Sequence, residues 1–77
     1  MNKVLFFANL KDIVGQDIVE MDLANKTVAQ AKQLILEKYP TLPLNNVMTA
    51  VSEEFAMDTD IIKENEDVAF IPPVSGG

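Results

Sequence analysis

Residues 27–38 carry the signals of an amphipathic helix, and this segment limits the fold because a helix with one apolar face packs against another layer. Thr27 is a suitable N-cap, and Gln30 stands three residues later, as in a capping box. Apolar residues recur at helical spacing at Val28, Ala31, Leu34 and Ile35. Pro40 cannot continue a helix. We therefore predict one main helix from Thr27 to Lys38.

The segments before this helix favour β-strands. Residues 3–8 (KVLFFA) are rich in strand formers, and residues 16–23 (QDIVEMDL) alternate with a period of two. Gly15 lies in the connection between them, so we expect a hairpin.

The segments after the helix complete a sheet. Residues 47–51 (VMTAV) and 67–71 (DVAFI) predict strands, and residues 52–57 (SEEFAM) predict a turn and a short strand. The order strand, strand, helix, strand, short strand, strand is typical of the β-grasp, or ubiquitin-like, fold. We expect an α+β domain in which a mixed sheet of four to five strands packs on one main helix, with the first and last strands parallel at its centre.

The size of the chain and its lack of cysteine indicate one small domain without disulfides. With 77 residues, it buries only about 60% of the surface that its unfolded chain exposes. We expect a β-grasp domain over residues 1–71 and an extended, flexible tail over residues 72–77. The absence of cysteine fits the cytoplasm, and the apolar run from Val4 to Ala8 is too short for a signal peptide or a membrane span.

Charge and side-chain chemistry exclude several classes of function. The net charge of −6 disfavours binding to nucleic acids or anionic membranes and favours a basic protein partner. The chain has no His and no Cys, so it lacks the usual catalytic base and zinc ligands, and Ser52 and Ser75 have no evident partner. The acidic residues Asp58, Asp60, Glu64, Glu66 and Asp67 lack calcium-loop spacing and fit a solvated loop. We expect no metal or cofactor bound by the chain itself.

The first and last predicted strands are apolar on both faces. Val4, Phe6 and Ala8 are expected to face the helix, together with Val68 and Phe70 of the last strand. Leu5, Phe7, Ala69 and Ile71 then point to the other face. We expect an exposed apolar patch that binds a partner, with a loop-covered second core as the alternative.

The end of the sequence favours a tail that enters a narrow channel. Pro72 and Pro73 stiffen the exit from the last strand, whereas Ser75, Gly76 and Gly77 have little bulk. Five residues from Pro73 reach at most about 17 Å, at ~3.4 Å each. The terminal carboxylate is then the reactive group that the tail would present in the channel.

The motifs VLFFANLKDIVG near the start and DVAFIPPVSGG at the end closely resemble the MoaD family, the small sulfur-carrying subunits of molybdopterin synthase. The resemblance implies that the Gly77 carboxylate is adenylated by an E1-like enzyme that uses ATP and magnesium. A sulfur donor, such as a cysteine desulfurase or a rhodanese-like protein, then converts it to a thiocarboxylate. Gly76, Ser75, Val74 and Pro73 would form the inserted part of the tail.

The same resemblance implies a large synthase subunit as partner, in a heterotetramer that delivers sulfur to cyclic pyranopterin monophosphate. Catalytic side chains would belong to that subunit, so the chain alone is not expected to be an enzyme. Leu5, Phe7, Phe55 and Ile71 fall where the family presents its apolar sheet face. Ser52 stands where the family often has asparagine, and we assign it no role.

Other functions remain open on the sequence alone. A thiamine-pathway sulfur carrier shares the fold and the terminal Gly-Gly, although Pro-Pro-Val is not expected there. A ubiquitin-like modifier would form isopeptide bonds to lysines of target proteins. A pure interaction module would keep its function without Gly76 and Gly77.

Overall fold

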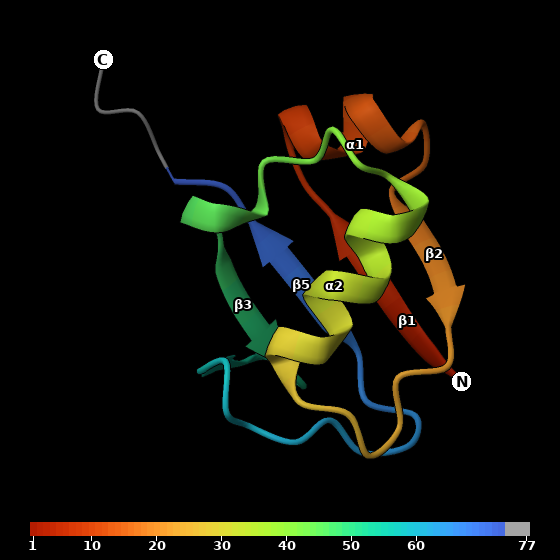
Figure 1. Cartoon of the computed structure of the whole chain (residues 1–77), viewed down its shortest axis with the longest axis vertical. Helices are drawn as coiled ribbons and strands as arrows, with labels where there is room; N and C mark the ends of the chain where they lie inside the picture. The colour runs from red at the N-terminus through yellow and green to blue at the C-terminus, as the bar shows by residue number, and fades with distance from the viewer. Residues whose placement is uncertain (74–77) are drawn as a thin grey trace.

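The computed structural model describes residues 1–73, in which five strands form one mixed sheet and a helix crosses one of its faces (Figure 1). The strands are β1 (Asn2–Phe6), β2 (Ile18–Met21), β3 (Met48–Val51), β4 (Glu54–Ala56) and β5 (Val68–Ile71). Their order in the sheet is β2-β1-β5-β3-β4. β1 and β5 pair in parallel, and the other neighbours are antiparallel. The predicted β-grasp architecture is confirmed.

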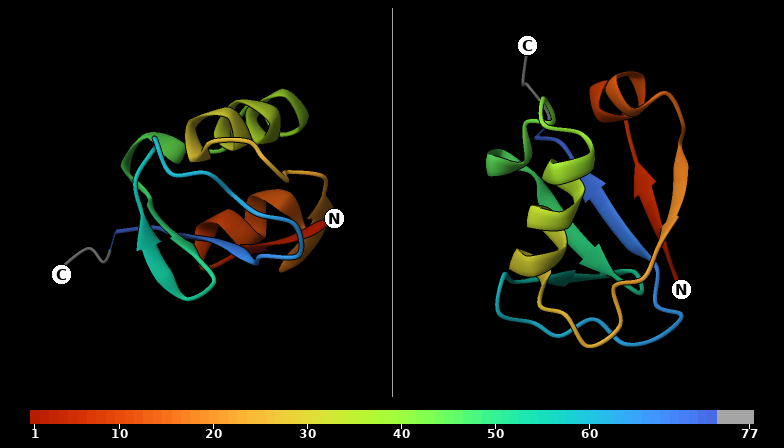
Figure 2. Two further views of the ribbon diagram at one scale, coloured as in Figure 1. Left: turned by 90° about the horizontal axis from the view of Figure 1, so that it is seen from below. Right: turned by 45° about the vertical axis from the view of Figure 1, so that its right-hand side comes forward.

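The main helix, α2 (Val28–Lys38), forms as the sequence predicts. The Gln30 amide donates to Thr27 Oγ1 at 3.1 Å, and the Thr27 amide donates to Gln30 Oε1 at 2.9 Å, which completes the capping box. The helix buries Val28, Ala31 and Ile35 against the sheet. Figure 2 shows it on one side of the strands. Among residues 1–73, no helix of this length covers the opposite face of the sheet.

The core lies between α2 and the inward side chains of the two central strands. Val4 and Phe6 of β1 are buried, as are Val68 and Phe70 of β5, as their alternation predicts. The rings of Phe6 and Phe70 stack with centroids 6.1 Å apart, and Tyr39 meets Phe6 edge-on at 6.3 Å. The centre of the sheet is thus fixed on its inner side by aromatic packing.

The connection between β1 and β2 differs from the expected hairpin. β1 and β2 do pair, but a short helix, α1 (Asn9–Val14), lies between them and ends at Gly15, which has a left-handed φ of 85°. The inward orientation predicted for Ala8 is wrong. The strand ends at Phe6, and Ala8 is exposed with φ 53° and ψ −130° because the chain turns there into α1. Leu10 of α1 is fully buried in the core, and this contact holds the turn against the domain.

The described chain has two further helices, and both are short. They are α1 and the single 3-10 turn η1 (Leu44–Asn46), which precedes β3. No helix within residues 1–73 combines the length and the apolar character needed to cross a membrane.

The loop that leads into β5 is fixed by polar contacts. Asn2 is 1% exposed, and its Nδ2 donates to the carbonyl oxygens of Lys63 and Glu66, each at 2.8 Å. Its Oδ1 accepts from the Leu23 amide at 3.0 Å. This buried amide therefore uses both of its N–H donors and one of its two acceptor positions. These bonds give the start of β5 a defined position.

Candidate functional site

One apolar row crosses the whole sheet on the face away from α2. The strand register places Ile18 opposite Leu5, Leu5 opposite Ala69, Ala69 opposite Ala50, and Ala50 opposite Phe55. Residues in register share a face, since side chains alternate along each strand. Small alanines occupy the central part of the row, and larger side chains stand at its ends.

This arrangement produces a hollow of about 340 Å³, which we call the sheet-face hollow. Its lining consists of Leu5, Phe7, Ala50, Glu53, Phe55, Asp67, Ala69 and Ile71. All four residues predicted as a partner interface are among them. Phe7 is 44% exposed and Phe55 72%, so within the described chain this face is open rather than a second covered core. Their role in binding a partner stays a prediction.

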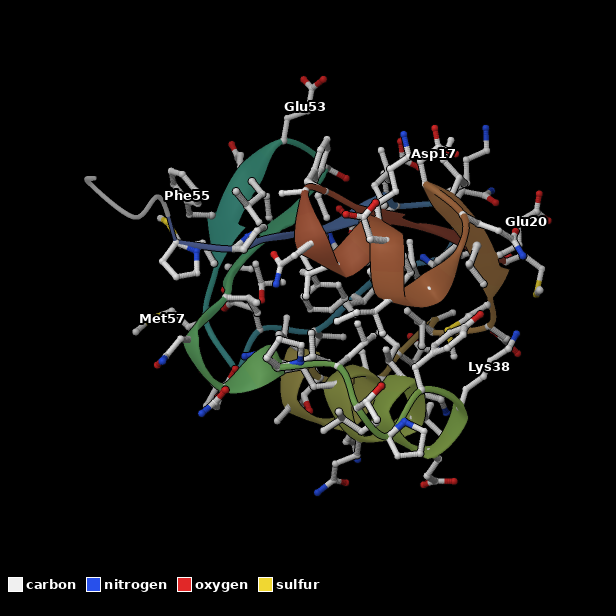
Figure 3. The ribbon with its side chains drawn as sticks, turned by 90° about the horizontal axis from the view of Figure 1, so that it is seen from above. Asp17, Glu20, Lys38, Glu53, Phe55 and Met57 are labelled. Carbon is white, nitrogen blue, oxygen red and sulfur yellow. The ribbon has the colours of Figure 1, made fainter. Side chains whose placement is uncertain are left out.

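The rim of the sheet-face hollow is acidic on one side. Glu53 and Asp67 belong to its lining, and Figure 3 shows Glu53 on the same side of the sheet as Phe55. Nearby, the Lys63 amide donates to the Glu66 carboxylate at 2.8 Å and the Ser52 hydroxyl donates at 2.9 Å. These two hydrogen bonds, the Lys63 amide first, lower the pKa of Glu66. An apolar surface with a negative rim is complementary to a partner that has basic residues around an apolar centre.

The turn between β3 and β4 gives Ser52 a structural role that the sequence did not reveal. Ser52 and Glu53 have φ values of 51° and 69°, as in the two-residue turns that suit the twist of a hairpin. The Ser52 amide also donates to the Asp67 carbonyl oxygen at 2.9 Å. Ser52 thus connects this hairpin to the segment that enters β5.

The base of the predicted tail lies at one end of the sheet-face hollow. Ile71 lines the hollow and pairs with Met48, while Pro72 is half-buried and Pro73 is exposed. β5 is flanked by β1 and β3, so the last described residues start from the centre of the sheet. The tail residues proposed to be functional, Val74, Ser75, Gly76 and Gly77, lie outside the described residues.

The acidic residues of the loop before β5 take part in contacts that hold this loop in place. Asp58 forms an ion pair with Lys32 at 2.9 Å, Asp60 accepts from the Met57 amide at 2.8 Å, and Glu64 pairs with the N-terminal amine. Among residues 1–73, no group of three or more acidic, His or Cys side chains is arranged to hold a metal ion. Two of these contacts attach the loop to α2 and to Met1, and the third closes a turn within it.

Sequence reasoning missed two residues of the apolar face. Ile18, 44% exposed, extends the row onto β2, and Ala50 forms part of the floor of the hollow. Both follow from the register between strands, which joins residues far apart in the chain. The period-two alternation of residues 16–23 was the available signal for Ile18, because it placed the side chains of Ile18 and Val19 on opposite faces of the sheet.

The family model described as ThiS family matches residues 4–77 of the chain. The chain belongs to the ThiS family. A relative of this ThiS-family chain, the molybdopterin synthase sulfur carrier subunit of Dictyostelium discoideum, is 36% identical over 81 residues, which cover 97% of this chain and 94% of the relative. The predicted resemblance is confirmed by this match.

Solved structures agree with the ThiS-family assignment at the level of the fold. SAMP1 from Haloferax volcanii superposes with a TM-score of 0.85 and 23% identity, covering 99% of this chain and 98% of that one. A chain in the complex of subunits 1 and 2 of the molybdopterin-converting factor from Helicobacter pylori 26695 gives a TM-score of 0.66 and 16% identity, with 99% and 97% coverage.

Proposed function

We propose that this chain is the sulfur-carrier subunit of a molybdopterin synthase and that the carboxylate of Gly77 is the group that carries sulfur. The single observation that supports this most is the sheet-face hollow, which is lined by all four predicted interface residues and ends at Ile71, the base of the tail. The 36% identity to a sulfur carrier subunit of that synthase supports the same assignment.

The proposed chemistry follows from the properties of a carboxylate. A terminal carboxyl group has a pKa of about 3.5, so it is ionised at neutral pH and is a poor acyl donor. An E1-like enzyme would transfer AMP from ATP to Gly77, releasing pyrophosphate with the help of magnesium. A persulfide on a donor protein would then attack the Gly77 acyl carbon and displace AMP, which gives an acyl disulfide. A second protein thiol would attack the donor's sulfur, form a disulfide with it and release the thiocarboxylate on Gly77. Free hydrosulfide would displace AMP and give the thiocarboxylate directly. That sulfur passes to cyclic pyranopterin monophosphate.

The proposed partner is the large subunit of the synthase, which would supply the catalytic side chains in a heterotetramer. The Helicobacter pylori structure is a complex of subunits 1 and 2 of the molybdopterin-converting factor, which supports pairing with a second kind of subunit. Binding of the sheet-face hollow would orient Ile71, Pro72 and Pro73 so that the tail enters the active site of the large subunit. We place these steps in the cytoplasm, in line with a chain that has no cysteine.

Fragmentation mass spectrometry of the terminal peptide tests the proposal. The chain is incubated with an E1-like enzyme, ATP, magnesium and sulfide, and its intact mass is compared with an untreated sample. Replacement of oxygen by sulfur adds about 16 Da, as oxidation of a methionine does, so the fragments must place the change. We expect it at Gly77 and not at Met1, Met21, Met48 or Met57.

A variant with one alanine added after Gly77 is the matched control. It should unfold at the same temperature as the original chain, because the buried core of the described chain reaches no further than Phe70, but it should accept no sulfur. Absence of the change at Gly77 under conditions that load a known carrier would contradict the proposal. So would isopeptide bonds from Gly77 to lysines of other proteins, which indicate a modifier.

A further inference from the structure

A second pocket lies on the other side of β4, between this edge strand and α2. We call it the edge pocket; it has a volume of about 440 Å³. Its lining includes Lys32 of α2, Thr49 of β3, and Phe55, Met57 and Asp58 from β4 and the residues after it. Figure 3 shows Phe55 and Met57 at the same edge of the sheet, with Met57 nearer to α2. The pocket is therefore on the helix side of the edge, whereas the sheet-face hollow is on the opposite side.

The edge pocket contains a polar group without a partner. Thr49 is only 5% exposed, and its Oγ1 is buried with no hydrogen-bond partner among the described residues. A buried hydroxyl left in this way costs free energy. Because its oxygen is closed off by the surrounding side chains, an occupant of the pocket contacts the apolar groups around Thr49 rather than the hydroxyl itself.

The rim of the edge pocket is strongly apolar and exposed. Met57 is 74% exposed, Phe55 72% and Met48 49%. Phe55 lines both the edge pocket and the sheet-face hollow, so the two surfaces are continuous around β4. Flexible methionines beside an aromatic ring adapt to side chains of different shape.

β4 offers a template for an added strand. It is the last strand of the sheet beyond β3, and a strand in that position presents backbone N–H and C=O groups away from its neighbour. The free groups are confined to the three residues of β4, because the N–H and C=O of Met57 are bonded to Asp60. An extended segment that pairs with the free groups of β4 would run along the edge pocket and direct alternate side chains into it.

The charges at this edge select between possible occupants. Glu54 belongs to β4, and Glu53, Asp58 and Asp60 lie close to it in the chain. The Lys32 amine is already paired with Asp58 at 2.9 Å. A second copy of this chain would bring the same acidic groups against one another, which opposes association. A segment with lysine or arginine on either side of an apolar residue is complementary instead.

We propose that the β4 edge and the edge pocket form a second docking site, which binds an extended, basic and apolar segment of a partner protein by strand addition. This site goes beyond the proposed sulfur transfer, because neither Gly77 nor the tail takes part in it. One apolar side chain of the segment fills the edge pocket near Thr49, and flanking basic side chains meet Glu54 and Asp58.

The test is an NMR titration of the ¹⁵N-labelled full chain with the capped peptide Lys-Val-Leu-Val-Lys. We expect saturable shifts of the amide signals of Thr49, Phe55, Ala56 and Met57. Replacing both peptide lysines by glutamate should weaken binding at least about tenfold. N-methylation of the central peptide amides should abolish binding, since strand addition needs the N–H groups of those amides as hydrogen-bond donors.

Protein variants make the test specific to this edge. Met57→Ser should weaken binding about threefold or more, as expected for the loss of an apolar contact. Ile18→Ser alters β2, the other edge strand, and should leave binding unchanged. Equal shifts at Val19 and Glu20 would show unspecific edge pairing and overturn the proposal. Shifts confined to Leu5 and Phe7 would place the peptide in the sheet-face hollow and would also overturn the proposal. Shifts of the edge signals when the chain is diluted without peptide would show that a second copy of the chain binds there, which overturns it too.

Discussion

Asn2 and Glu66 are joined by a hydrogen bond of 2.8 Å from the Asn2 side-chain Nδ2 to the Glu66 carbonyl oxygen, across 64 positions of the chain. Because Asn2 also binds Lys63 and Leu23, one buried amide connects the start of β1 with the end of β2 and the turn before β5. The strand that leads to the tail is therefore positioned by a residue at the opposite end of the sequence.

Replacing Asn2 by alanine should lower the free energy of unfolding by about 2–4 kcal/mol, because three main-chain groups lose their partner in or near the core. Urea denaturation followed by circular dichroism measures this. Asn2→Asp keeps the acceptor for the Leu23 amide but loses both donors, so it should also be destabilising at neutral pH. A loss below about 0.5 kcal/mol for both variants would contradict this role.

Glu66 should contribute to stability only above acidic pH. Its pKa is lowered from 4.5 by hydrogen bonds from the Lys63 amide and the Ser52 hydroxyl, so the folded state favours the charged form. The contribution is present above the unfolded value and is lost as the pH falls through the folded pKa. A ¹³C titration of the carboxyl group should give a value below 4.5, and Ser52→Ala should raise it. A value at or above 4.5 in the original chain would exclude the effect.

Ala8→Gly should stabilise the fold by about 1 kcal/mol, because glycine adopts a positive φ without the steric cost that alanine has. Ala8 has φ 53° at the start of α1. Ala29→Gly, inside α2, is the matched control and should destabilise by about 1 kcal/mol. Chemical denaturation of both variants is the measurement. Equal destabilisation by the two substitutions would show that Ala8 is not strained.

Phe7→Ala should weaken binding of the large synthase subunit about 30-fold, or ~2 kcal/mol, if the sheet-face hollow is the interface. Phe7 is 44% exposed, so its truncation should leave the fold intact. Ile13→Ala on α1, where Ile13 is 42% exposed outside the hollow, should bind like the original chain. Calorimetric titration compares the three. The same affinity for Phe7→Ala and the original chain would place the interface elsewhere.

Local patterns explain why much of the fold could be predicted. The capping box of Thr27 and Gln30 and the alternation of Val4 and Phe6 depend on neighbouring residues, and both are found as expected. Helix α1 could not be predicted in this way, since it has only six residues and depends on burial of Leu10 in the core.

The candidate site was only partly predictable for a related reason. Leu5, Phe7 and Ile71 follow from alternation within two strands, whereas Ile18 and Ala50 enter the apolar row through pairing with other strands. The importance of Asn2 was equally hidden, because a single polar residue near the N-terminus gives no sign that its partners lie 21 to 64 positions away.

The parallel pairing of β1 with β5 also has a mechanical consequence. A force applied to the C-terminal end of β5 runs along the strand, and the hydrogen bonds to β1 and β3 on either side must then shear together. They cannot open one at a time, as the bonds of a peeled edge strand do. The domain should therefore resist being unravelled when it is pulled from the C-terminal end of β5.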